Sequence, residues 1–179
     1  MTIRWAHQNV ARWLKEMNPE TVTIMFGSND VGQMDVEEYE RRTREVVRHC
    51  LTNGTVVILS AMPPRSHRMD EGWQFMEAAR KVARGERVPL INYFAEILKR
   101  RPEDWDGSLP QFQGAGSEYQ VLTLIARDGV HPSNPSQYAN DFSDEALRNN
   151  GYSLRNHLTL LAYADVIEKV LHPARPGRL

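Results

Sequence analysis

The sequence predicts an α/β protein with three layers, in which helices cover both faces of a parallel sheet. Two short apolar runs, at 21–26 and 55–60, have the near-continuous apolarity of strands buried on both faces. Amphipathic helical patterns alternate with these strands, as in right-handed β–α–β crossovers. The 179 residues, 41% of them hydrophobic, suit a single domain over 1–171 followed by a tail at 172–179.

The chain opens with a helical pattern and continues as strand, helix, strand, helix, strand, helix. The first helix is expected over 3–17, where apolar residues recur at helical spacing until Asn18-Pro19 interrupts them. A second helix is expected from Asp35 to Leu51, with acidic residues in its first turn and Gly54 at its C-terminal end. The next elements are a helix at 71–84, a strand at 88–92 and a helix at 94–98.

The last third of the chain is predicted to be mostly loop. Segment 102–150 is rich in glycine, proline and polar residues, which indicates an ordered loop with short helical turns, and loops of this length are often functional. Ser153 is expected to cap a final amphipathic helix, which ends at His172-Pro173 and docks on the sheet.

Charge and composition exclude several kinds of partner and site. A net charge of −1 gives no electrostatic reason to expect nucleic acid or an anionic membrane surface as partner. No apolar run approaches the roughly 18 residues of a membrane span. The single cysteine, Cys50, excludes an internal disulfide and a multi-cysteine metal site. Neither a metal nor another cofactor is expected, because four histidines lack a second ligand at metal spacing: His7, His49, His67 and His157.

The tetrapeptide Gly27-Ser28-Asn29-Asp30 follows the first predicted strand. Open α/β sheets present ligand-binding groups at this position, and the carboxamide of Asn29 can donate a hydrogen bond there. For an isolated match, a structural Gly-Asn-Asp turn with an Asx hydrogen bond is the more common explanation.

A second motif places Asp128 three residues before His131. Through a compact turn the carboxylate can reach Nδ1, fix the tautomer and leave Nε2 to accept a proton from a hydroxyl nucleophile. A bare D-x-x-H also arises by chance in surface turns. Here the two motifs occur together, the first at the end of a predicted strand and the second ahead of the last helix, which favours a functional interpretation.

This pairing resembles the SGNH (GDSL-type) hydrolase family over about residues 3–171. The resemblance implies a flavodoxin-like α/β/α fold and an ester hydrolase that acts through an acyl-enzyme on a small ester or an acetylated carbohydrate. It implies that Asn29 donates a side-chain N–H to the oxyanion, that His131 is general base and acid, and that Asp128 orients His131.

Two neighbours of Asn29 are expected to support it. Gly27 is expected to belong, with Asn29, to the residues that bind the oxyanion and the substrate. Its main role is to allow the backbone to turn sharply after the strand, because glycine has no Cβ. Asp30 is expected to hold the loop through local hydrogen bonds.

Two blocks of the family pattern are missing from the 179 residues: the Gly-Asp-Ser block with the nucleophile, and the second block, whose glycine donates to the oxyanion. No other serine replaces the nucleophile convincingly. Ser28 competes with Asn29 for one pocket, Ser60 is expected to be a capping or loop hydroxyl, and Ser133 is too close in sequence to His131. The first strand and both blocks are therefore expected upstream of Met1 or on a partner.

Three hypotheses follow for function. In the first, the complete protein is an ester hydrolase, and this chain alone is inactive. In the second, the chain is a non-catalytic SGNH-like binding or interaction domain. A phosphate or nucleotide binder is least favoured, because no glycine-rich loop opens a helix.

The sequence also predicts self-association. Without the family's first strand, the run 21–26 becomes an open sheet edge that invites pairing with a second copy of the chain.

Overall fold

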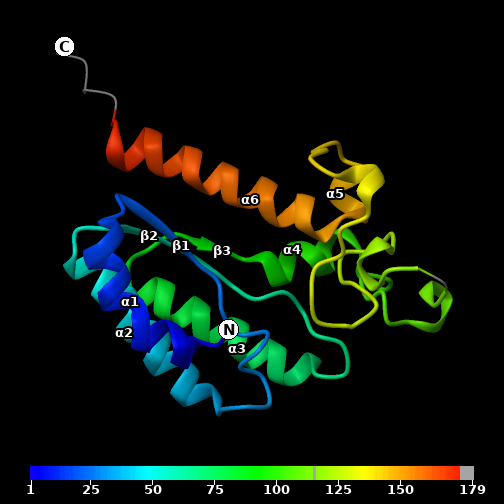
Figure 1. Ribbon diagram of the computed structural model, residues 1–179, viewed down its shortest axis with the longest axis horizontal. Helices are drawn as coiled ribbons and strands as arrows, with labels where there is room; N and C mark the ends of the chain where they lie inside the picture. Colours follow the sequence, from blue (N-terminus) through cyan, green and yellow to red (C-terminus); the bar gives the residue numbers. More distant parts are fainter. Residues whose placement is uncertain (115, 174–179) are drawn as a thin grey trace.

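A parallel sheet of three strands forms the centre of the computed structural model, which describes residues 1–114 and 116–173 (Figure 1). The strands are β1 (Thr21–Ile24), β2 (Val56–Ser60) and β3 (Leu90–Ile91), and they are hydrogen-bonded in the order β1-β2-β3. A helix lies between each strand and the next in the sequence. The predicted alternation of strands and helices is confirmed.

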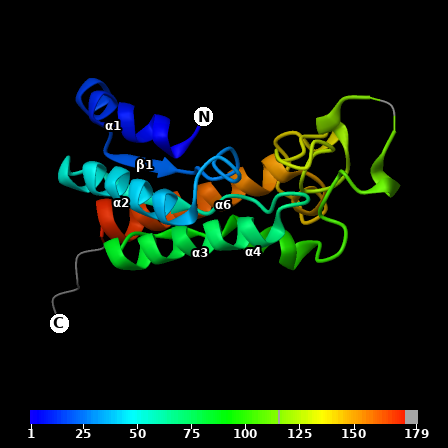
Figure 2. The same cartoon turned by 90° about the horizontal axis from the view of Figure 1, so that it is seen from below.

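Helices cover both faces of this sheet, as expected. α1 (Ile3–Met17), α2 (Val36–Thr52) and α3 (Met69–Glu86) lie on one face, and α6 (Gly151–Val166) lies on the other (Figures 1 and 2). The side chains of β2 alternate between the two layers. Val57 and Leu59 join the apolar cluster of α1, α2 and α3, whereas Ile58 joins the cluster of α6.

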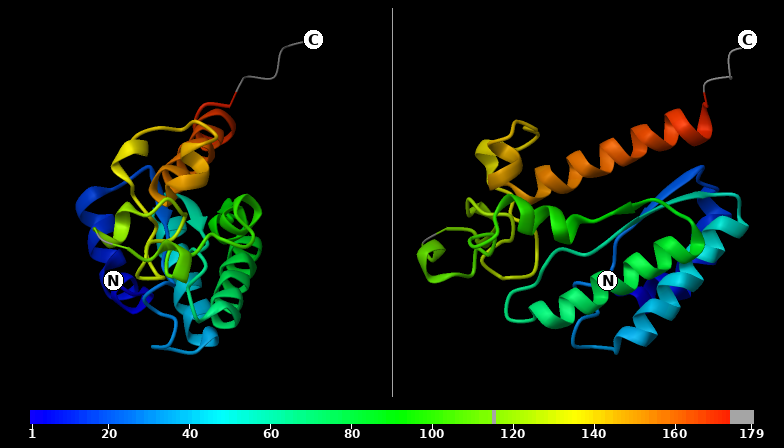
Figure 3. Two further views of the ribbon diagram at one scale, coloured as in Figure 1. Left: turned by 90° about the vertical axis from the view of Figure 1, so that its right-hand side faces the viewer. Right: turned by 180° about the vertical axis from the view of Figure 1, so that it is seen from behind.

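β1 is an edge strand with unequally covered faces. Its backbone pairs with β2, and within the described ranges no strand pairs with its other edge. Ile24 is buried under the three-helix layer, but Thr23 is exposed on the opposite face. The expectation that 21–26 is covered on both faces is therefore wrong for β1, because α6 packs against β3 and Ile58 instead. Figure 3 shows α6 on the side of the sheet opposite α1, α2 and α3.

The long connection before α6 has the predicted character. After α4 (Tyr93–Arg100), it contains three short 3-10 turns and the four-residue helix α5. These elements lie at Pro110–Phe112, Glu118–Gln120, Ser136–Tyr138 and Ala146–Asn149.

The start of α6 differs from the prediction. The helix begins at Gly151, and the side chain of Asn150, not that of Ser153, caps it by accepting a hydrogen bond from the Ser153 N–H at 2.9 Å. The Ser153 hydroxyl instead donates to the Tyr138 carbonyl. The helix continues as a π-helical turn over Ile167–Leu171 and then ends at His172, as predicted. In the predicted tail, 174–179 lie outside the described residues.

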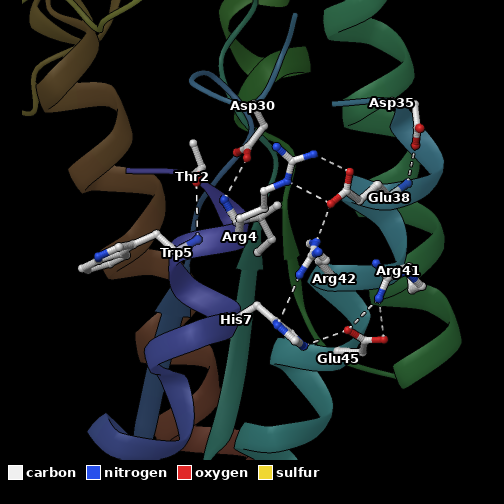
Figure 4. Close-up of polar contacts among 11 residues, drawn as sticks. Thr2, Arg4, Trp5, His7, Asp30, Asp35, Glu38, Arg41, Arg42 and Glu45 are labelled. Atoms are coloured by element: carbon white, nitrogen blue, oxygen red, sulfur yellow. Dashed lines mark hydrogen bonds and ion pairs between the residues drawn. The ribbon is translucent and has the colours of Figure 1, made fainter. Parts of the chain in front are cut away.

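A network of ion pairs joins α1 to α2 (Figure 4). Glu38 on α2 accepts hydrogen bonds from Arg4 of α1 at 2.6 Å and from Arg42 at 2.7 Å. These two guanidinium groups lower the pKa of Glu38 to about 2. Next to them, His7 of α1 lies 2.8 Å from Glu45.

Acid should therefore weaken the packing of α1 on α2. Because the folded-state pKa of Glu38 is lowered from 4.5 to about 2, its contribution to stability is complete above pH 4.5 and is lost as the pH falls toward about 2. We expect Glu38→Gln to flatten the dependence of Tm on pH in this window, measured by circular dichroism. As control, Glu16→Gln on α1 changes a carboxylate that is 60% exposed and 4.0 Å from its nearest partner. An unchanged pH profile in Glu38→Gln would contradict the assignment.

Candidate active site

The Gly27-Ser28-Asn29-Asp30 turn follows β1 directly. Gly27 has a φ of +129°, and a Cβ at this position would lie 2.7 Å from the sulfur of Met62. The turn thus requires glycine for its backbone conformation and for its close approach to Met62.

Asp30 fixes this turn to the start of α1. Its carboxylate is fully buried and accepts hydrogen bonds from the Ile3 N–H at 2.9 Å and from the Gly27 N–H at 3.0 Å. Burial raises the pKa of Asp30, although both N–H groups act in the opposite direction. The Asp30 side chain does hold the loop, but it also makes a contact across 27 positions that the local motif did not predict.

Arg65 supports the turn from the other side. Its Nη1 donates to the carbonyl oxygens of Ser28 and Val31, both at 3.0 Å. Sequence reasoning missed this residue, because nothing in the sequence around Arg65 indicates a partner more than 30 positions away.

Asp128 and His131 form the compact turn that their spacing suggested. The imidazole Nδ1 lies 2.6 Å from Asp128 Oδ2, and Asp128 Oδ1 accepts the N–H groups of Val130 and His131 at 2.8 and 2.9 Å. Partial burial alone would raise the pKa of Asp128, but these hydrogen bonds outweigh it and lower the pKa. The carboxylate therefore stays ionised and can stabilise an imidazolium.

One cavity is lined by residues of both motifs. It has a volume of about 430 Å³ and lies between the carboxyl end of β1 and the N-terminal part of α6. The amide of Asn29 donates to the Met1 carbonyl at 3.2 Å at the rim. The lining residues are Met1, Trp5, Met25, Phe26, Gly27, Ser28, Asn29, Pro63, Val130, His131, Pro132, Tyr152 and Arg155. A larger hollow of about 660 Å³, between α1 and α2, contains neither motif.

The three serines considered as nucleophiles occupy different places. Ser28 lines the cavity. Ser60 is buried and donates to the Ala61 carbonyl. Ser133 is fully buried, donates to the Thr123 carbonyl and accepts from the Gly151 N–H, so its hydroxyl serves the fold. In the described part of the chain, no serine hydroxyl is hydrogen-bonded to the His131 imidazole.

Comparison with known families identifies the chain. A model of the GDSL-like lipase/acylhydrolase family matches residues 2–137, which include both motifs. The chain belongs to this family. A search of curated proteins gives no match.

Solved structures share the fold of this GDSL-like chain at low sequence identity. A Bacteroides fragilis NCTC 9343 protein with a provisional acylhydrolase assignment has a TM-score of 0.65 at 14% identity, covering 94% of this chain and 72% of its own. A GDSL-like lipase from Bacteroides thetaiotaomicron VPI-5482 has a TM-score of 0.59 at 16% identity, with coverages of 93% and 72%.

A third similar structure is the acetylxylan esterase Axe2 from Geobacillus stearothermophilus. It has a TM-score of 0.59 at 17% identity and covers 88% of this chain and 68% of its own. Its structures include catalytic mutants in which a serine, an aspartate or a histidine is replaced. The aspartate and the histidine are three positions apart in that esterase.

Residues 1–114 and 116–173 lack two further features. This part of the chain contains no group of three His, Cys, Asp or Glu side chains placed to hold a metal ion. It also contains no helix long and apolar enough to cross a bilayer.

Loss of the Asp30 carboxylate should destabilise the protein. Asp30→Ala leaves the buried Ile3 and Gly27 N–H groups without an acceptor, and we expect it to lower the free energy of unfolding by about 2–4 kcal/mol, measured by urea denaturation. Asp35→Ala is the matched control, because Asp35 caps α2 through one exposed bond, whose loss costs about 1 kcal/mol. If both variants lose the same free energy of unfolding, Asp30 contributes no more to stability than a helix-capping side chain such as Asp35.

Proposed function

We propose that residues 1–171 form a single SGNH hydrolase-like domain that supplies most of the catalytic groups of a serine ester hydrolase. In this proposal, His131 is the general base and acid, and Asp128 orients it. Asn29 donates its side-chain N–H to the oxyanion, and Gly27 allows the backbone turn that presents it. The substrate is a small ester or an acetylated carbohydrate.

The observation that carries the proposal is the shared cavity. His131, in contact with Asp128 at 2.6 Å, and Asn29 come from turns about 100 positions apart, yet both line it. Membership of an acylhydrolase family supports the assignment. The catalytic mutants of the acetylxylan esterase Axe2 add support, because its catalytic aspartate and histidine have the spacing of Asp128 and His131.

The proposal places the reactive serine on polypeptide outside these 179 residues, either upstream in the same protein or on a partner. The sequence contains no Gly-Asp-Ser, and none of the candidate serines is hydrogen-bonded to the imidazole. The open edge of β1 ends at Ile24, and the next two residues, Met25 and Phe26, line the cavity. A strand added to this edge could therefore deliver a serine between Asn29 and His131.

The isolated chain should be inactive. We expect no turnover of p-nitrophenyl acetate above the buffer rate and no covalent labelling by a fluorophosphonate, because both need a hydroxyl activated by His131. Once polypeptide carrying the serine is restored, activity should appear, and Asn29→Ala should then lower kcat by about 10²–10³-fold.

Labelling of the isolated chain would contradict this placement of the serine, provided that His131→Ala abolishes it. Ser28→Ala would then show whether Ser28, which lines the cavity, is the labelled residue. A restored protein that remains inactive and unlabelled would reject the esterase proposal.

A second candidate is a binding or interaction domain without catalysis. The absence of a hydroxyl partner for His131 in the described residues, together with the bond between Asn29 and the Met1 carbonyl, favours it. The encoding DNA tests the placement of the serine upstream in the same protein. An in-frame Gly-Asp-Ser upstream of Met1 supports the esterase, whereas an upstream stop codon leaves the binding domain or a serine supplied by a partner.

We also propose that the isolated chain associates with itself through the free edge of β1. Thr23 is exposed on this strand, and no strand of the described chain covers its edge. Sedimentation velocity should show an association that increases with concentration, and Thr23→Lys should weaken it, because a charge on an edge opposes pairing. Gln8→Lys, at an exposed position of the neighbouring α1, adds the same single positive charge away from the strand edge and is the control for a change of charge alone. A wild-type chain that stays monomeric at all concentrations would refute the proposal.

A further inference from the structure

One cation in the candidate active-site cavity has no anionic partner in the described part of the chain. Arg155, on the second turn of α6, lines the cavity together with His131 and Asn29, and no lining residue is acidic. The hydrogen bond that its guanidinium makes to a side chain is a long one of 3.4 Å to Asn156 Oδ1. The cations at the α1–α2 contact differ, because Arg4 and Arg42 both bind Glu38.

Tyr152 holds the guanidinium of Arg155 in place. The Cζ atom of Arg155 lies 4.3 Å from the centroid of the Tyr152 ring, which is the geometry of a cation–π contact. Stacking of this kind orients the plane of the guanidinium but leaves its N–H groups available for hydrogen bonds. An oriented guanidinium matches the two oxygens of a carboxylate or a phosphate.

The rest of the cavity suits the chain between an ester and an anion. Trp5, Met25 and Phe26 provide apolar lining, and Asn29 and His131 provide the groups proposed to act on the ester carbonyl. A volume of about 430 Å³ holds a small molecule with both groups.

We infer that Arg155 and Tyr152 form an anion-binding subsite, and that the ester substrate carries a carboxylate or a phosphate away from the bond that is cleaved. This inference rests on the proposed function, because it takes the cavity as the active site. It names the class of substrate, which the family assignment leaves open.

The test measures binding to the 179-residue chain by NMR titration, so that it does not depend on turnover. The probes are monomethyl succinate, its neutral counterpart dimethyl succinate, and phenyl phosphate. We expect at least one anion to bind about tenfold more tightly than dimethyl succinate, as is typical of a charge-assisted hydrogen bond. Monomethyl succinate as the tighter anion indicates a carboxylate substrate, and phenyl phosphate as the tighter anion indicates a phosphate.

Variants then assign the preference to the guanidinium. Arg155→Gln should abolish it, and Arg155→Lys should retain part of it, because an ammonium keeps the charge but loses the planar pair of donors. Arg12→Gln is the control, because the Arg12 side chain on α1 is 61% exposed, and it should behave as wild type.

Two results would overturn the inference. The first is equal affinity of the wild-type chain for neutral and anionic probes. The second is a preference that survives Arg155→Gln, since His131 or the α-amino group of Met1, which also line the cavity, would then be the cation responsible. Neither result would affect the serine-labelling experiment, which tests the proposed function separately.

Discussion

The buried carboxylate of Asp30 is the interaction on which the arrangement of the site depends. A carboxylate in the protein interior is costly unless hydrogen bonds compensate it, and Asp30 finds two donors in the backbone of Ile3 and Gly27. The same bonds fix the turn after β1 against the start of α1. Asn29 lies inside this turn, so its position at the cavity follows from how Asp30 is satisfied.

The two halves of the site are built on different principles. Asp128 and His131 meet within one turn, and the backbone N–H groups that bind the carboxylate also keep it ionised. Asn29 instead depends on long-range support from Asp30 and Arg65. Asp128 and His131 are therefore a local unit, whereas their approach to Asn29 requires the folded sheet.

The open edge of the sheet lies beside the candidate active site, where the proposed function needs a serine from outside the 179 residues. β1 is an edge strand, Thr23 is exposed on it, and the cavity opens where the strand ends. Structures of family members match nearly the whole of this chain over about 70% of their own length. A proposed strand at this edge would therefore cover exposed surface and supply the missing hydroxyl at the same time.

The sequence by itself determined the alternation of strands and helices, the glycine turn after β1 and the contact between Asp128 and His131. These features depend on periodicity or on neighbours within a few positions, which a sequence displays directly. Tertiary structure alone decided that Asn150 rather than Ser153 caps α6, that Ser133 is buried, and that Trp5, Tyr152 and Arg155 line one cavity with His131. Each of these outcomes depends on which distant surfaces come together, and local sequence around an arginine or a tryptophan contains no record of the partner it meets.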